Sequence, residues 1–92
     1  MKYAKILSMK RINGSTYGNP NYEFKLQESD MAQAAISGLS HGEHSVDIVT
    51  RRTSANISDS YGIIPNEARE GACMSYELTK AGRISRVYKV TK

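Results

Sequence analysis

The chain has 92 residues, of which 39% are hydrophobic and 24% charged, and its formal net charge is +4. A chain of this length forms one domain, residues 1–92, with a modest core, and its apolar runs are too short to cross a bilayer. The single cysteine, Cys73, cannot form an internal disulfide. This favours a reducing cytoplasm.

Two strands are predicted first. Residues 2–12 are rich in β formers, and both of their faces are partly apolar, which favours a central strand. The two expected faces are Ala4, Ile6 and Ile12 on one side and Tyr3, Leu7 and Met9 on the other. Residues 21–28 alternate more cleanly: Tyr22, Phe24 and Leu26 share the inward face, and Glu23, Lys25 and Gln27 share the outward face. We expect this second strand to pair antiparallel with the first, across a loop at 13–20.

The hydrophobic period changes after residue 28. Ser29 or Asp30 is placed to cap a helix, and Asp30 with Gln33 has the spacing of a capping box. Apolar residues then recur at helical spacing: Met31, Ala35 and Leu39, with Ala32 and Ile36 beside them. We expect a helix of two to three turns that ends at Gly38 or Gly42.

Three further strands follow. Residues 45–53 predict a strand with Val46 and Ile48 inward and Asp47 outward, and residues 54–71 predict a long loop. Residues 72–79 and 83–91 predict a hairpin, turned at residues 80–82. Its first strand has three inward residues: Met74, Tyr76 and Leu78. The element order is ββαβββ, which predicts an α+β fold. We expect a curved antiparallel sheet of about five strands with one short helix, or a small partly closed barrel.

The residues that could carry chemistry do not form a catalytic set. His41 and His44 have a spacing that can hold a metal ion, but no further ligands are evident, and a solvated loop explains them better. Cys73 fits a buried core thiol better than a nucleophile. Glu67 and Glu70 fit the exposed face of a helical turn. We therefore expect no enzyme, no metal and no cofactor.

The charges are segregated along the chain. Residues 1–22 contain cations and no acid, residues 78–92 contain cations and no acid, and all nine acids lie within residues 23–77. We expect the first and last strands to lie side by side in the sheet, so that their cations gather on one region. Such a patch suits a polyanion or an acidic protein surface.

Six cations are the candidate partner-binding residues. Arg51 and Arg52 are adjacent on a strand, so one of them should be exposed beside the long loop, where it could bind an anion, although a solvated pair explains them as well. The supporting patch consists of Lys10, Arg11, Arg83 and Arg86. Arg86 shares a face with Tyr88, a pattern that suits a stacked base and a phosphate. Alternatively, Tyr88 belongs to the core and Arg86 protects an edge strand against aggregation.

The two ends of the chain carry a family resemblance. The stretches MKYAKILSMKRINGSTYGNP and LTKAGRISRVYKVTK resemble small phage-encoded anti-CRISPR proteins, in particular an inhibitor of the type I-F surveillance complex. The resemblance implies a non-enzymatic inhibitor in the host bacterial cytoplasm that binds the RNA-guided complex and blocks its binding of target DNA. Its partners would be Cas proteins, with the guide RNA as a second candidate contact. It implies no membrane and no small-molecule substrate.

The alternative is a small β-barrel that binds free nucleic acid. The same terminal cations would contact phosphates, and Tyr17, Tyr61 or Tyr88 would serve as stacking platforms. Such binding would depend steeply on salt.

Overall fold

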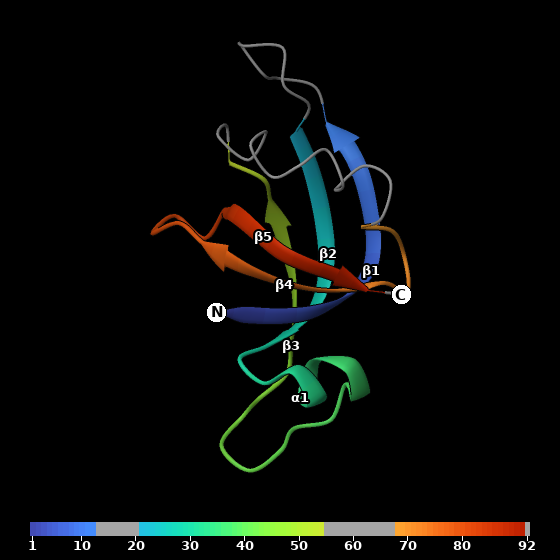
Figure 1. Cartoon of the computed structure of the whole chain (residues 1–92), viewed down its shortest axis with the longest axis vertical. Helices are drawn as coiled ribbons and strands as arrows, with labels where there is room; N and C mark the ends of the chain where they lie inside the picture. The colour runs from blue at the N-terminus through green and yellow to red at the C-terminus, as the bar shows by residue number, and fades with distance from the viewer. Residues whose placement is uncertain (13–20, 55–67, 92) are drawn as a thin grey trace.

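The computed structural model describes residues 1–12, 21–54 and 68–91, and it contains five strands and one helix in the order ββαβββ (Figure 1). The elements are β1 (Lys2–Ile12), β2 (Asn21–Ser29), α1 (Ala32–Ser37), β3 (Asp47–Arg52), β4 (Cys73–Leu78) and β5 (Ile84–Thr91). The predicted element order and the α+β class are confirmed. The predicted loop at 13–20 and most of the loop at 54–71 lie outside the described residues.

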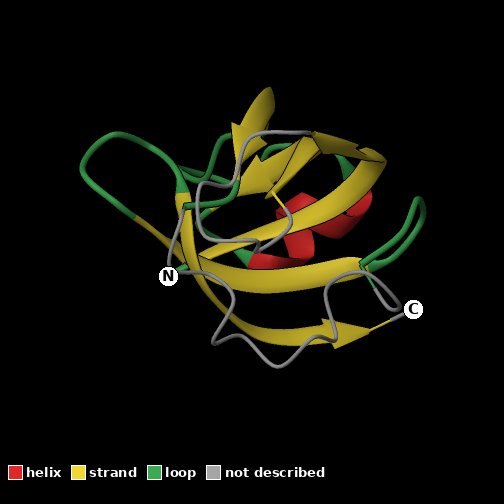
Figure 2. Ribbon diagram, turned by 90° about the horizontal axis from the view of Figure 1, so that it is seen from above, coloured by secondary structure: helices red, strands yellow, loops and turns green. Residues whose placement is uncertain are grey.

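All five strands belong to one antiparallel sheet with the order β3-β2-β1-β4-β5. β1 pairs with β2 over nearly its whole length but with β4 only over Lys2–Lys5. The sheet curls, as Figure 2 shows, until its edge strands meet at one parallel bridge between Thr53 and Ile84. There the amide of Ser54 donates to the carbonyl oxygen of Ile84 at 2.9 Å. The sheet is therefore open along most of its edges and closed at one point.

A β-bulge in β1 decides which of its residues face the core. The register with β2 shifts between Ile6 and Ser8, so Ile6 lies opposite Leu26 and Met9 lies opposite Phe24. One extra residue reverses the alternation of a strand, because side chains alternate with a period of two. Met9 consequently packs against the core. The prediction that Met9 faces away from Ala4 and Ile6 was wrong.

The core occupies the concave side of the sheet. Its buried residues come from four strands and from the segment that precedes β4: Ala4, Ile6, Tyr22, Phe24, Leu26, Ala68, Ala72, Met74, Tyr76, Ile84 and Val87. Leu78 and Val90 pack against them in part. The predicted inward faces of residues 21–28 and 72–79 are confirmed.

The inward face of β3 differs from the prediction. Val49 lies opposite Leu26 and Arg51 opposite Phe24, so these two residues face the core side. Ile48 lies opposite Gln27 and is exposed. Because Ile48 and Val49 are adjacent and both apolar, only the register with β2 decides between them. The prediction of an inward Ile48 was wrong.

Helix α1 is shorter than expected. Its N-cap is Met31 without a side-chain cap, and Ser29 instead accepts a hydrogen bond from the Met31 amide, so the predicted capping box is absent. The helix ends at Gly38, one of the two predicted stops, which has φ of 76° and donates its amide to Ala34. Leu39 therefore lies beyond the helix and is exposed. Ala34 and Ala35 form the buried face in place of the predicted Met31–Ala35–Leu39 stripe.

Gly38→Ala should destabilise the protein by about 2 kcal/mol, since a side chain at positive φ is strained and the new methyl needs space. A Cβ at Gly38 would lie 3.0 Å from Oε1 of Gln27, whose Nε2 donates to the Ala35 carbonyl at 2.7 Å. Gly42→Ala is the matched control: φ is 57° there, but a Cβ would meet nothing within 4 Å. Urea unfolding should show a larger loss for Gly38→Ala. Equal losses would mean that the Gln27 contact is unimportant.

Candidate functional site

The six candidate cations do not form one patch. β4 lies between β1 and β5, so the first and last strands are not neighbours, and the expected side-by-side arrangement was wrong. Figure 1 shows β4 running between the other two. The reason is topological: the β4–β5 hairpin joins the sheet through β4, which occupies the edge of β1 that β5 would need.

All three guanidinium nitrogens of Arg51 donate hydrogen bonds to other residues of the protein. Its Nε and Nη2 donate to the two oxygens of the Glu28 carboxylate at 3.0 and 2.8 Å, and its Nη1 donates to the carbonyl oxygen of Gly82 at 3.1 Å. The side chains of Arg51 and Glu28 are only 22% and 5% exposed. Such a bidentate pair fixes β2 to β3 and to the β4–β5 turn. Arg51 is therefore a structural residue, and the geometry gives no support to its predicted role in binding an anion.

Tyr76 completes this buried network. Its hydroxyl donates to Oε2 of Glu28. Burial opposes ionisation of Glu28, but the hydrogen bonds from Arg51 and Tyr76 outweigh it and lower the pKa of this carboxyl below its ordinary value. Burial and the nearby carboxylate both raise the pKa of Tyr76. The network thus holds a carboxylate and a neutral phenol.

The lowered pKa of Glu28 predicts a loss of stability in acid. The folded pKa lies below the ordinary value of 4.5. The stabilisation is therefore complete above that value and is lost as pH falls through the folded pKa. We expect the free energy of unfolding, measured in urea from about pH 7 to about pH 3, to fall at the acid end. Glu23→Gln should keep most of this fall, because Arg52 and Lys10 also lower the pKa of Glu23 but are themselves exposed cations. Glu28→Gln should make the fall clearly smaller, and an unchanged profile in that variant would contradict the assignment.

A second cluster lies on the outer face of the sheet, across β1, β2 and β3. Glu23 stands opposite both Lys10 and Arg52. Lys10 Nζ lies 3.2 Å from Oε1 of Glu23, and Arg52 Nε lies 3.1 Å from its Oε2. The cation side chains are 69% and 57% exposed. Lys25, two residues after Glu23 on β2, is exposed. It lies opposite Ser8 of β1 and opposite Thr50 of β3. We call Lys10, Glu23, Lys25 and Arg52 the cationic face.

The cationic face borders a shallow groove of about 290 Å³. Its lining residues are Ser8, Met9, Lys10, Glu23, Lys25 and Thr50. Two cations and two hydroxyls thus line one concavity, with the carboxylate of Glu23 among them. Hydroxyl and ammonium groups donate hydrogen bonds to phosphate oxygens. The groove can therefore accept an anion that lies close to Lys25.

The other three predicted cations are separate from this face. Arg11 is exposed near the end of β1. Arg83 is exposed in the β4–β5 turn, where its amide donates to the Thr79 hydroxyl. The guanidinium of Arg86 lies 5.3 Å from the ring centre of Tyr88, so the predicted pairing of these two residues is confirmed. Tyr88 is exposed, which removes the alternative that it belongs to the core. Tyr17 and Tyr61 lie outside the described residues.

His41 and His44 lie in one turn, where the backbone amide of each donates to the carbonyl oxygen of the other. Nδ1 of His44 lies 2.9 Å from Oδ1 of Asp30. Within residues 1–12, 21–54 and 68–91, no group of three or more His, Cys, Asp or Glu side chains could hold a metal ion.

Cys73 is half-buried rather than fully buried in the core. In the same part of the chain, no helix is long and apolar enough to cross a membrane.

Sequence reasoning missed Lys25 and Glu23 as members of the site. The sequence predicts that both side chains point outward from the second strand. It does not show that Arg52 lies opposite Glu23 on the neighbouring strand, where the two can form an ion pair. The missing information was the register between β2 and β3.

Comparison with known proteins identifies no relative of this chain: no family model, no curated protein and no solved structure matches it.

Proposed function

We propose that the protein is a non-enzymatic module that binds single-stranded nucleic acid through the phosphates on its cationic face. The observation that supports this most is the gathering of three exposed cations around one acid on the outer face of β1, β2 and β3. In small, partly open five-stranded barrels, the face of the second and third strands is a common oligonucleotide site.

The ion pairs of the cationic face leave donors for a ligand. Arg52 uses only its Nε towards Glu23, and no hydrogen bond from its two Nη groups is recorded within the described residues. No ion pair of the described residues includes Lys25. Glu23 therefore holds Lys10 and Arg52 in place, while a phosphate can bind the remaining donors.

Fluorescence anisotropy with a labelled oligothymidylate of about 15 nucleotides tests this function. We expect binding at about 50 mM salt that weakens steeply towards about 300 mM, because phosphate contacts release counterions. Absence of binding at the lowest salt would contradict the proposal.

Inhibition of a type I-F surveillance complex is the second candidate function, and the mixed charge of the cationic face favours it. Glu23 sits among the cations, so this surface could meet phosphates of a guide RNA and lysines of a Cas protein together. The inhibitor implied by the resemblance would dock on such a nucleoprotein surface. Arg52 and Lys10 remain candidate contacts under this function, whereas Arg51 does not.

Size-exclusion chromatography with a purified type I-F complex separates the two functions. An inhibitor should co-elute with the complex, prevent target DNA from binding and show weak affinity for the free oligonucleotide. A nucleic-acid module should bind the oligonucleotide and leave DNA binding by the complex intact. Failure to co-elute would remove the second candidate.

A further inference from the structure

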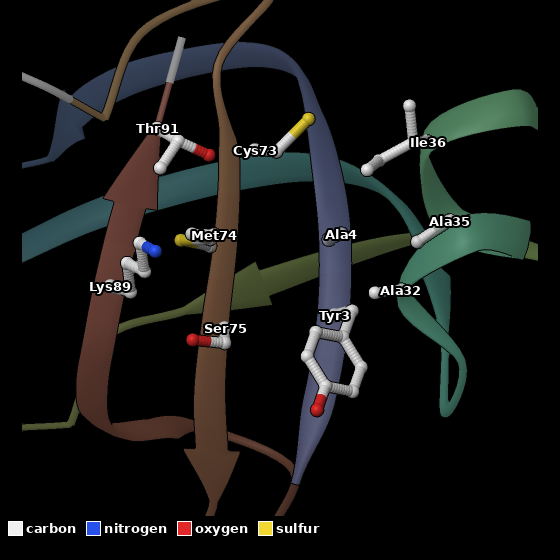
Figure 3. Close-up of a pocket in the computed structure, with 10 residues that line it drawn as sticks. All are labelled: Tyr3, Ala4, Ala32, Ala35, Ile36, Cys73, Met74, Ser75, Lys89 and Thr91. Carbon is white, nitrogen blue, oxygen red and sulfur yellow. The ribbon is translucent and has the colours of Figure 1, made fainter.

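A second groove, of about 150 Å³, lies between α1 and the outer side of β4, above the first residues of β1 (Figure 3). Ile36 projects from α1 on one side, and Cys73 projects from β4 on the other. The ring of Tyr3 stands at one end of the groove. The remaining lining residues are Ala4, Ala32, Ala35, Met74, Ser75, Lys89 and Thr91.

The lining is mainly aliphatic and carries one charge. Ile36 is 55% exposed although it is apolar, and it forms a wall of the groove. Lys89, exposed on β5, is the charged residue among those that line the groove. A cavity of about this volume holds one benzene ring. The groove therefore has the size for a single aromatic or branched side chain, with a cation at its rim.

We propose that this groove docks a partner protein by taking one apolar side chain, next to a partner carboxylate that pairs with Lys89. Charge complementarity identifies the partner's chemistry, because the rim offers an ammonium group and the lining carries no acid. Single buried anchors of this kind dominate many protein interfaces. The site does not depend on the cationic face, which lies on β1, β2 and β3.

The lining favours an apolar side chain over a nucleobase. A base needs hydrogen-bond partners for its edges and a flat surface for stacking. The α1 wall, formed by Ala32, Ala35 and Ile36, provides neither and suits a phenyl or branched aliphatic group. The polar groups and the one aromatic ring of the lining come from the strands: Tyr3, Ser75, Lys89 and Thr91.

NMR titration of the ¹⁵N-labelled protein with N-acetylphenylalanine tests the proposal, since this probe joins a phenyl ring to a carboxylate. We expect amide shifts at Ile36, Cys73 and Ser75 that saturate with a Kd on the order of a few mM. N-acetylphenylalanine amide, which lacks the carboxylate, should bind about threefold more weakly. Ligand should also slow alkylation of Cys73 by iodoacetamide, a clean readout because this is the only cysteine of the chain.

Two variants and a matched control sharpen the test. Ile36→Ser should weaken binding at least about fivefold, because it removes the apolar wall. Lys89→Gln should abolish the preference for the acid over the amide. Leu39→Ser is the control, since Leu39 is exposed and apolar but does not line the groove. It should leave both affinities unchanged.

Three outcomes would overturn the proposal. They are no saturable shift at the groove residues, equal binding of acid and amide in the wild type, or an effect of Leu39→Ser as large as that of Ile36→Ser. Shifts at these residues with adenosine monophosphate, but not with N-acetylphenylalanine, would assign the groove to a base instead.

Discussion

Replacing Arg51 by alanine should lower the free energy of unfolding by about 3 kcal/mol or more. The Glu28 carboxylate is 5% exposed and would lose both guanidinium donors. Within the described part of the chain, Tyr76 would then be the remaining hydrogen-bond donor to this buried charge. The carbonyl of Gly82 would lose its donor as well. Urea unfolding followed by circular dichroism measures the loss.

Arg52→Ala is the matched control for this prediction. It is the next residue along β3 and also pairs with a glutamate, but its side chain is 57% exposed. Exposed pairs contribute below about 1 kcal/mol. If Arg51→Ala does not fold, Arg51→Lys should still show an intermediate loss, because it keeps the charge but not the bidentate contact. Equal losses in Arg51→Ala and Arg52→Ala would contradict the assignment.

A double variant separates the buried charge from lost packing. Arg51→Met with Glu28→Gln removes the carboxylate along with its partner. It should recover much of the stability that Arg51→Ala loses, since the main cost is an unpaired buried charge. No recovery would mean that the guanidinium acts chiefly by filling space.

Charge changes on the cationic face should move affinity for single-stranded nucleic acid in opposite directions. Lys25→Gln removes a cation that forms no ion pair among the described residues, and we expect about tenfold weaker binding at about 50 mM salt. Glu23→Gln removes the acid that holds Lys10 and Arg52, and we expect tighter binding, because both cations become available to phosphate. Anisotropy titrations at fixed salt measure both effects.

Lys89→Glu is the control for net charge. It changes the total by two units, but it lies on β5, and two strands of the sheet separate β5 from β2. It should alter oligonucleotide affinity less than Lys25→Gln does. A larger effect would show that total charge, rather than the cationic face, controls binding.

Much of the fold could be predicted because its signals are local. The alternation of residues 21–28 predicts one strand and the turn at residues 80–82 predicts one hairpin, and both are confirmed. The stop at Gly38 follows from the tolerance of glycine for positive φ. These features depend on residues close together in the chain.

The errors in the strands arise from long-range pairing. Alternation shows that Ile48 and Val49 face opposite sides, but only the register with β2 shows which one is inside. The bulge that turns Met9 inward leaves no mark in the composition of β1. Arg51 was identified as a surface anion contact because its buried partner, Glu28, lies 23 residues away along the chain.

The most direct test of the cationic face is the salt dependence of oligonucleotide binding in the wild type and in Lys25→Gln. Three phosphate contacts, one each for Lys10, Lys25 and Arg52, predict a slope of roughly −2 for the logarithm of affinity against the logarithm of salt concentration. Lys25→Gln should reduce the steepness of this slope by about 0.7. A slope that this variant leaves unchanged would place the phosphates elsewhere on the protein and contradict the proposed function.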